Sequence, residues 1–249
     1  MDVIFREIAE EKIVAAVCMK SVEAGKDSNN MTESAYFKMK NMIFQQYIVP
    51  GQKLTYRELA KLLNMSSTPV QFALGRLEQE GFVERIPNVG YYVRKINPQE
   101  IEDLFDLRWI LEVHAIEYAI KNHTPEDLEV LDKLIQDHKN YQIQIYDRKK
   151  LFLDATFHSQ IASLSGNLEI VKQLKRIFEH TYLRSPVELI PPSRIPIAVS
   201  QHEQILQLIK ERDIGRAKEC LGKHIQEAKE ARRAMLWSLP SINISAASM

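Results

Sequence analysis

The sequence predicts a mainly α-helical protein in which an N-terminal winged helix-turn-helix module precedes an all-helical bundle. Three observations support this fold class. Apolar residues recur at helical spacing along most of the chain. Strand-forming runs with a turn between them occur at one place, between residues 82 and 93. Basic residues are concentrated in the short N-terminal region that contains these runs.

The composition is that of an ordinary globular protein. The chain has 249 residues, of which 45% are hydrophobic and 27% are charged, and this excludes a disordered or fibrous chain. Only eight glycines are present, which argues against glycine-rich phosphate loops. Two cysteines, Cys18 and Cys220, are too few for a disulfide framework and indicate a reducing compartment. Because the chain has neither a long apolar run nor a signal peptide, we expect a cytoplasmic protein without a membrane partner.

Charge is unevenly distributed although the whole chain is neutral, with 33 basic and 33 acidic residues. Residues 35–96 contain nine basic and four acidic residues, a net charge of +5, whereas residues 1–34 and 97–249 carry −3 and −2. A positive module joined to a larger, slightly negative one is typical of a nucleic-acid reader with a separate control domain. Chance clustering explains the charge distribution equally well, so the function has to be inferred from motifs.

Residues 1–34 are predicted to form an N-terminal extension whose last part, residues 21–34, is a polar linker. Apolar residues at helical spacing then predict a first helix over residues 36–47, and Pro50-Gly51 ends it.

The helix-turn-helix follows directly. Thr55 and Glu58 have the spacing of a capping box and open a short second helix. Asn64 tolerates the left-handed conformation that a tight turn needs. The segment Ser66–Pro69 supplies N-cap hydroxyls and a proline for a third helix, which Gly81 closes.

Two β-prone runs, 82–86 and 91–93, flank the turn-forming segment 87–90 and predict a hairpin. Helix, helix, tight turn, helix and hairpin within about sixty residues form a winged helix-turn-helix, which we assign to residues 35–96 as the DNA-binding domain.

Residues 97–238 are predicted to form a bundle of six or so helices. Asn97-Pro98 and Thr124-Pro125 each combine an N-cap residue with a proline at the first helical position. Further helices are expected to start near Asp147, Asn167, Pro196 and Asp213. Residues 239–249 are expected to form a polar tail that frays.

These motifs resemble a known family. The winged helix-turn-helix is similar to that of GntR-type bacterial transcription regulators, in the residues Pro50-Gly51, Leu54, Leu59-Ala60, Thr68-Pro69-Val70, Ala73-Leu74, Leu77-Glu78, Glu80 to Val83, and Gly90. The helical part resembles the ligand-binding FCD domain of the FadR-type branch, in the residues Arg108, Leu111-Glu112, Ala115, Asp154, Phe157-His158, His202, Ile205, Asp213, Ala217 and His224. The resemblance covers residues 36–238 and implies a DNA-binding regulator with an effector- and metal-binding domain.

The N-terminal end of the third helix is expected to enter the major groove. Gln71 can pair with adenine, and the nearby hydroxyls suit phosphates or base edges, although they also cap the helix. The family usually has arginines where this chain has Ser67, Gln71 and Gly75, so its base preference should differ. By resemblance, the second helix lies against the DNA backbone and the wing tip over the minor groove. The expected DNA-binding residues are Tyr56, Arg57, Ser66, Ser67, Thr68, Gln71, Arg76, Asn88 and Gly90. For Arg57, a solvated surface charge is the alternative.

Four residues of the helical part form a candidate metal site. Asp154 and His158 lie four positions apart on a predicted helix and therefore share one face. That spacing alone more often marks a salt bridge or a polar face than a ligand pair. The resemblance adds His202 and His224, which lie where metal-binding members of the family carry histidine. Three imidazoles and one carboxylate suit a divalent Zn, Ni, Mn or Fe ion. The other histidines, 114, 123, 138 and 180, are interpreted as ordinary surface or core residues.

Arg108 is the candidate effector-binding residue. In the family this arginine points into the cavity beside the metal, where a guanidinium and a divalent cation together would bind a small organic acid. An ion pair with Glu112 or another carboxylate of the bundle is the alternative role for Arg108. Arg184 and Arg194 are possible second anchors but are interpreted as surface residues.

The sequence therefore favours a transcription regulator, and not an enzyme, whose DNA affinity is set by a small carboxylate. Because one recognition helix reads few base pairs, we expect a homodimer on an inverted repeat in double-stranded DNA. A helical metalloenzyme that acts on a small organic acid and a pure metal sensor are the alternatives. The identity of the effector, repression or activation, and translation from Met1 or Met31 stay open.

Overall fold

The structure, a computed structural model, divides into two units, residues 1–95 and residues 96–249. It describes residues 28–95, 97–143, 147–183 and 190–237. The predicted apolar part of the N-terminal extension and the polar tail 239–249 lie outside the described residues.

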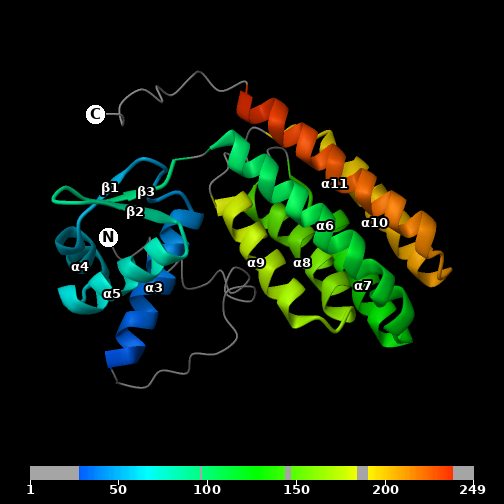
Figure 1. The fold of residues 1–249 in the computed structure, drawn as a ribbon, viewed down its shortest axis with the longest axis horizontal. Helices are drawn as coiled ribbons and strands as arrows, with labels where there is room; N and C mark the ends of the chain where they lie inside the picture. The colour runs from blue at the N-terminus through cyan, green and yellow to red at the C-terminus, as the bar shows by residue number, and fades with distance from the viewer. Residues whose placement is uncertain (1–27, 96, 144–146, 184–189, 238–249) are drawn as a thin grey trace. The chain divides into compact units, whose positions relative to one another are not determined.

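The first unit has the elements of a winged helix-turn-helix, as predicted (Figure 1). Its helices are α3 (Ser28–Phe44), α4 (Tyr56–Leu63) and α5 (Ser67–Gln79). Its strands are β1 (Lys53–Leu54), β2 (Val83–Ile86) and β3 (Gly90–Val93), which form an antiparallel sheet in the order β1-β3-β2. β1 was not predicted from the sequence.

The first helix begins earlier than the sequence predicts. Residues 28–34 are helical, although they belong to the predicted polar linker. A long-range contact explains the difference, because Glu33 forms an ion pair with Arg76 of α5 at 2.6 Å. The polar first turns of α3 are thus joined to the module by a residue 43 positions away, which helical periodicity does not detect.

Local signals fix the turn between α4 and α5. The Thr55 hydroxyl accepts a hydrogen bond from the Glu58 backbone N–H at 3.3 Å, so this predicted cap is confirmed. Asn64 adopts the left-handed conformation with φ 53°, which turns the chain sharply into α5. Ser66 is the N-cap residue of α5, but its side chain forms no capping hydrogen bond among the described residues. The hydroxyl is therefore not used in the way that the sequence indicates.

The second unit is a bundle of helices, with caps at Asn97, Thr124 and Asp147 as predicted. Its helices are α6 (Pro98–Asn122), α7 (Pro125–Asn140), α8 (Arg148–Leu164), α9 (Leu168–Leu183), α10 (Arg194–Lys210) and α11 (Ile214–Trp237). α6 runs along α11, while α8 packs against α6, α7 and α9 (Figure 1). α10 packs against α7 and α11. No helix in the described part of the chain is long and apolar enough to cross a membrane.

α8 lies in the middle of this bundle and determines its core. Phe157 and Ile161 are almost completely buried, together with Leu131 of α7 and Leu174 of α9. The same helix buries the polar residues Asp154 and His158. A group that carries charge inside an apolar core needs partners, because desolvation of an unpaired charge is costly.

Candidate metal centre and DNA-reading surface

The structure brings the four predicted metal ligands together inside the bundle. Asp154 and His158 come from α8, His202 comes from α10 and His224 from α11. One ligand atom from each residue lies within 4.8 Å of the others, and all four residues are buried. Three helices, of which α10 and α11 are consecutive, therefore supply one cluster.

Hydrogen bonds fix the tautomers of two of these histidines. His158 donates from Nδ1 to Glu112 Oε2 at 2.6 Å. His224 donates from Nδ1 to Gln201 Oε1 at 2.9 Å, and the amide nitrogen of Gln201 donates to Glu227 at 2.9 Å. Because Nδ1 carries the proton in both rings, each Nε2 atom presents a lone pair to the centre of the cluster.

The arrangement of these atoms fits a cation. The Nε2 atoms of His158 and His224 are 3.1 Å apart. The Nε2 atom of His202 lies 3.4 Å from His224 Nε2 and 3.4 Å from Asp154 Oδ1. Two imidazole lone pairs that face each other at this distance repel, whereas a divalent ion between them is attracted to both. Imidazole nitrogens with one carboxylate oxygen form a donor set that suits Zn, Ni, Mn or Fe.

The pKa values of Asp154, His202 and His224 favour the ligating states of these three residues. Burial would raise the pKa of Asp154, but the imidazoles of His158 and His202 lower it well below its usual range. Burial lowers the pKa of His202 and lowers that of His224 still further. An ionised carboxylate and neutral imidazoles are the forms that bind a metal ion.

A cavity of about 40 Å³ adjoins the cluster. Arg108, Arg194 and Arg232 line it beside Asp154 and His224. Arg108 is 2% exposed and donates from Nε to Glu112 at 2.6 Å. The ion pair with Glu112, which was the alternative role for Arg108, is therefore present, and Arg108 also lines the cavity. Arg194 was interpreted as a surface residue, and this is wrong because it lines the cavity and pairs with Glu227 at 2.9 Å. Arg184 lies outside the described residues.

Sequence reasoning missed the residues that hold the ligands. Glu112 was considered only as a partner of Arg108, although it also accepts the hydrogen bond from His158, 46 positions away. Gln201 precedes a predicted ligand, but its partner is His224, 23 positions later. Arg232 lines the cavity and is buried. No local pattern marks Glu112 and Gln201 as partners of the ligands, because each contacts a histidine of another helix.

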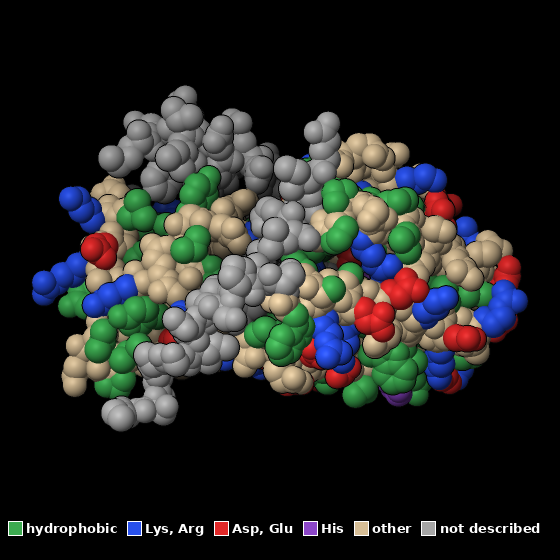
Figure 2. Space-filling model, turned by 90° about the horizontal axis from the view of Figure 1, so that it is seen from above, with side chains coloured by type: hydrophobic (Ala, Val, Ile, Leu, Met, Phe, Trp, Pro, Cys, Tyr) green, Lys and Arg blue, Asp and Glu red, His purple; other side chains and the backbone are tan. Residues whose placement is uncertain are grey.

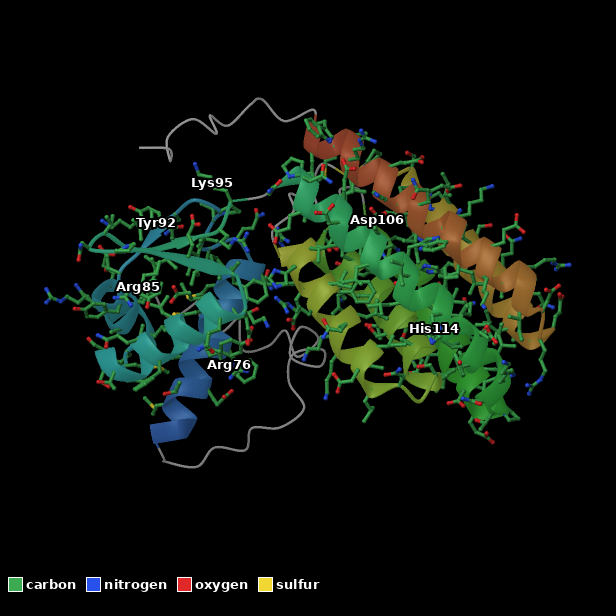
Figure 3. The ribbon with its side chains drawn as sticks, viewed as in Figure 1. Arg76, Arg85, Tyr92, Lys95, Asp106 and His114 are labelled. Atoms are coloured by element: carbon green, nitrogen blue, oxygen red, sulfur yellow. The ribbon has the colours of Figure 1, made fainter. Side chains whose placement is uncertain are left out.

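The other histidines differ in their surroundings. His138 and His180 are buried, whereas His114 is exposed and projects from α6 (Figure 3). The ring of His138 lies 5.4 Å from the ring of His202. Among the described residues, neither ring nitrogen of His138 has a hydrogen-bond partner. His138 is therefore a buried imidazole next to the cluster.

Several of the predicted DNA-reading residues are exposed on the first unit. Ser66, Thr68 and Gln71 are exposed at the N-terminal end of α5, and Ser67 is half-buried. Arg57 is exposed at the start of α4, with its guanidinium 5.9 Å from the ring of Tyr56. On the face shown in Figure 2, the module carries more basic than acidic side chains.

The wing adopts the turn that its sequence predicts. Asn88 has φ 61° and Gly90 has φ 133°, which close the connection between β2 and β3. Arg85 of β2 and Lys95, which follows β3, are both exposed (Figure 3). These two cations were not among the predicted DNA-binding residues.

Arg76 has a structural role that the sequence did not predict. Its guanidinium pairs with Glu33 at 2.6 Å and with Glu80 at 3.1 Å, and it lies 3.7 Å above the ring of Tyr36. In Figure 3 the side chain extends from α5 next to α3. Two carboxylates and an aromatic ring thus hold the charge of Arg76 within the module.

Comparison with known proteins agrees with this architecture. Residues 31–93 match the gntR family of bacterial regulatory proteins, and residues 103–227 match the FCD domain. The Nta operon transcriptional regulator of Aminobacter aminovorans is 33% identical over 139 residues, which are 55% of this chain and 65% of that protein. The HTH-type transcriptional regulator McbR of Escherichia coli is 28% identical over 183 residues, 72% of this chain and 81% of McbR.

Solved structures have the same fold. The structure of E. coli McbR/YncC covers 83% of this chain and 98% of its own, with a TM-score of 0.70 and 22% sequence identity. A GntR transcriptional regulator from Rhodococcus sp. RHA1 covers 84% of this chain and 99% of its own, with a TM-score of 0.61 and 17% identity.

The buried imidazole of His138 predicts that acid destabilises the helical unit. Burial lowers the pKa of His138 to about 3, whereas an imidazole in the unfolded chain titrates near ~6.5. The unfolded state therefore binds more protons between these two pH values. The stability that neutral His138 contributes is fully present above pH ~6.5 and is lost as the pH falls toward 3. At pH 5 the loss from this group is about 2 kcal/mol.

Replacement of His138 by phenylalanine removes this proton uptake. We expect the His138→Phe variant to gain more stability over the wild type at pH 5 than at pH 7.5, measured by urea denaturation with a chelator present. An equal gain at both pH values would show that His138 is not the group responsible.

Proposed function

Because the chain belongs to the gntR family of bacterial regulatory proteins and carries an FCD domain, it is a DNA-binding transcriptional regulator, and we propose that a small carboxylate bound beside a divalent metal ion controls its affinity for DNA. The two relatives above are named as transcriptional regulators, and the chain is accordingly not assigned an enzymatic activity.

The observation that supports the metal proposal most directly is the orientation of the ligand atoms. Glu112 and Gln201 hold His158 and His224 with their protons on Nδ1, so that the Nε2 lone pairs face each other at 3.1 Å. The chemistry that a bound divalent ion would supply is an electrophilic centre for an anionic ligand. Asp154 and His202 complete the set of residues that would hold the ion.

Three arginines support an acidic effector. Arg108, Arg194 and Arg232 line the cavity next to the proposed metal ligands, and a guanidinium recognises a carboxylate through paired hydrogen bonds. A cavity of about 40 Å³ has room for a few water-sized groups, and thus for one carboxylate. We propose that an acid which fills more than this space moves the surrounding helices.

The position of α6 in the chain couples this movement to DNA binding. α6 carries Arg108 and begins at Pro98, after only the four residues 94–97 that follow β3 of the wing. A shift of α6 on effector binding therefore changes the position of the chain where it leaves the DNA-binding module. A coupling free energy of about 1–3 kcal/mol, or 5–150-fold in affinity, would suffice for regulation.

An apolar stripe on α6 supports the proposed homodimer. Leu107, Ile110 and Tyr118 are 41%, 57% and 42% exposed, and their spacing puts them on one face of the helix. An exposed apolar stripe of this kind is typical of a surface that another chain covers. A second copy would also double the number of base pairs read, which a single recognition helix needs for useful specificity.

Loss of two imidazoles should abolish metal binding. We expect the wild type, stripped with chelator and reloaded with Zn²⁺, Ni²⁺, Mn²⁺ or Fe²⁺, to retain one of these ions stoichiometrically after dialysis. The double variant His202→Ala/His224→Ala should retain none, because it keeps only two of the four ligands.

Two further variants test whether the loss is specific. Exposed His114 lies outside the cluster, so His114→Ala should bind metal as the wild type does. Gln201→Leu removes the partner of His224 Nδ1 and should weaken metal binding by about 10–100-fold. Stoichiometric metal in the double histidine variant would refute the proposed site.

The arginine of α6 should be required for the response to a carboxylate. Removal of Arg108 alone would leave the buried Glu112 carboxylate without its cation, so we choose the double variant Arg108→Met/Glu112→Gln, with Glu112→Gln as its control. The glutamine keeps an acceptor for His158.

We expect acetate or succinate to change the DNA affinity of the metal-loaded control by about 5–150-fold and to leave that of the double variant unchanged. Fluorescence anisotropy measures the DNA affinity of both variants, with a duplex that the wild type has selected from a random pool. A response to metal alone, with no effect of either acid, would favour the metal-sensor alternative.

Two substitutions should distinguish base reading from contacts to the DNA backbone in the DNA-binding module. Duplexes selected from a random pool should contain two inverted half-sites. On such a duplex, Gln71→Ala should weaken specific binding by about 1–3 kcal/mol, because it removes contacts to one base. Arg57→Ala should weaken binding to all sequences alike and lower the salt dependence by about one counterion. If the two variants lost affinity for specific and random DNA equally, Gln71 would not be the reading residue.

A further inference from the structure

The recognition helix α5 exposes a large apolar side chain. Phe72 is 66% exposed, and among the described residues it is the only phenylalanine with an exposed side chain. The buried face of α5 is formed by Val70, Ala73, Leu74 and Leu77, so Phe72 is not needed for the core of the module. It lies directly after Gln71, in the second turn of the helix that is proposed to enter the major groove.

On the same face of α5, the next turn carries a glycine and therefore no side chain. Gly75 lies three positions after Phe72 and four after Gln71, and these spacings put the three residues on one face. A methyl group added at Gly75 would meet no described atom within 4 Å. Glycine in a helix interior is less stable than alanine, and packing within the module gives no reason for it here. The gap therefore suits the close approach of another molecule.

We propose that Phe72 contacts the C5-methyl group of a thymine in the major groove and that Gly75 lets the groove edge approach the helix closely enough for this contact. The inference rests on the proposed placement of α5 in the major groove. The thymine methyl is the one apolar group that bases present in that groove, and a phenylalanine side chain is suited to bind it.

The neighbouring residue agrees with this reading. Gln71 is suited to an adenine, so a Gln71-Phe72 pair would read adjacent A·T positions, one by hydrogen bonds and one by an apolar contact. Cations on the same module, Arg57 and Arg85 among them, are exposed and available to the phosphates. Phosphate contacts thus position the module, while the apolar contact adds specificity that does not depend on charge.

Deoxyuridine provides a direct test, because it differs from thymidine only in lacking the C5-methyl group. The full-length protein would first select duplexes from a random pool. Each thymine of the selected half-site would then be replaced by deoxyuridine, one position at a time. We expect the wild type to bind about fourfold more weakly when one particular thymine is replaced, which corresponds to the burial of one methyl group.

The Phe72→Ala variant should bind the thymine and deoxyuridine duplexes with equal affinity, and Phe72→Leu should keep part of the difference. The matched control is Val130→Ala, which truncates an exposed apolar residue of the helical unit and should leave the discrimination intact. Wild-type protein that binds both duplexes equally at every position would overturn the inference, and so would discrimination that persists in Phe72→Ala. If the wild type selected no duplex at all, the proposed readout by α5 would fail as well.

A second variant gives two effects of opposite sign. Gly75→Ala should raise the thermal stability of the protein, because alanine is the better helix former and the methyl group meets no clash. The same methyl group should weaken binding to the selected duplex several-fold by holding the groove edge away. Unchanged or tighter binding in this more stable variant would contradict the close approach at Gly75.

Discussion

The two hydrogen bonds accepted by Glu112 determine how the interior of the helical unit is arranged. One carboxylate oxygen accepts from Arg108 at 2.6 Å and the other from His158 at 2.6 Å. Burial would raise the pKa of Glu112, but Arg108 and His158 lower it below its usual value. The ionised carboxylate therefore connects the arginine of the cavity to a histidine of the cluster. Glu112 thus holds both Arg108 and His158, and Arg108 and Glu112 are each only 2% exposed.

In a buried network of this kind, the cost of losing any one charged residue constrains the sequence more than the stability that the intact network contributes. Removal of one charge leaves its partner unpaired in a low-dielectric interior, which costs several kcal/mol, whereas the intact network contributes little net stability. The second connection, from His224 through Gln201 to Glu227 and Arg194, extends to a half-buried part of the cavity wall. The chemistry of the site thus depends on residues of four helices that cannot be exchanged independently.

Much of the fold follows from local signals in the sequence, whereas the details of the site do not. Thr55 and Asn64 could be assigned because a cap and a left-handed turn depend on a few adjacent residues. Asp154 and His158 share a face at fixed helical spacing, so half of the ligand set was visible locally. β1 has two residues, too few for an alternating pattern.

Contacts between distant residues account for the errors. The early start of α3 depends on the pair of Glu33 with Arg76, and Arg194 enters the cavity wall through Glu227. Gln201 orients an imidazole on a different helix. In each case the partner lies more than twenty positions away, and periodicity carries no information over that distance.

The small volume of the cavity has a consequence for the time scale of signalling. In the proposed mechanism, an acid that needs more room than this cavity offers would enter while the helices around Arg108 and Arg194 are apart. Association with such a site is slower than a diffusional encounter, because only the open fraction of molecules can capture a ligand. Once the helices close, dissociation is slow for the same reason. Under the proposed regulation, the protein would therefore average the effector concentration over time and respond to a sustained supply of the acid instead of following brief fluctuations.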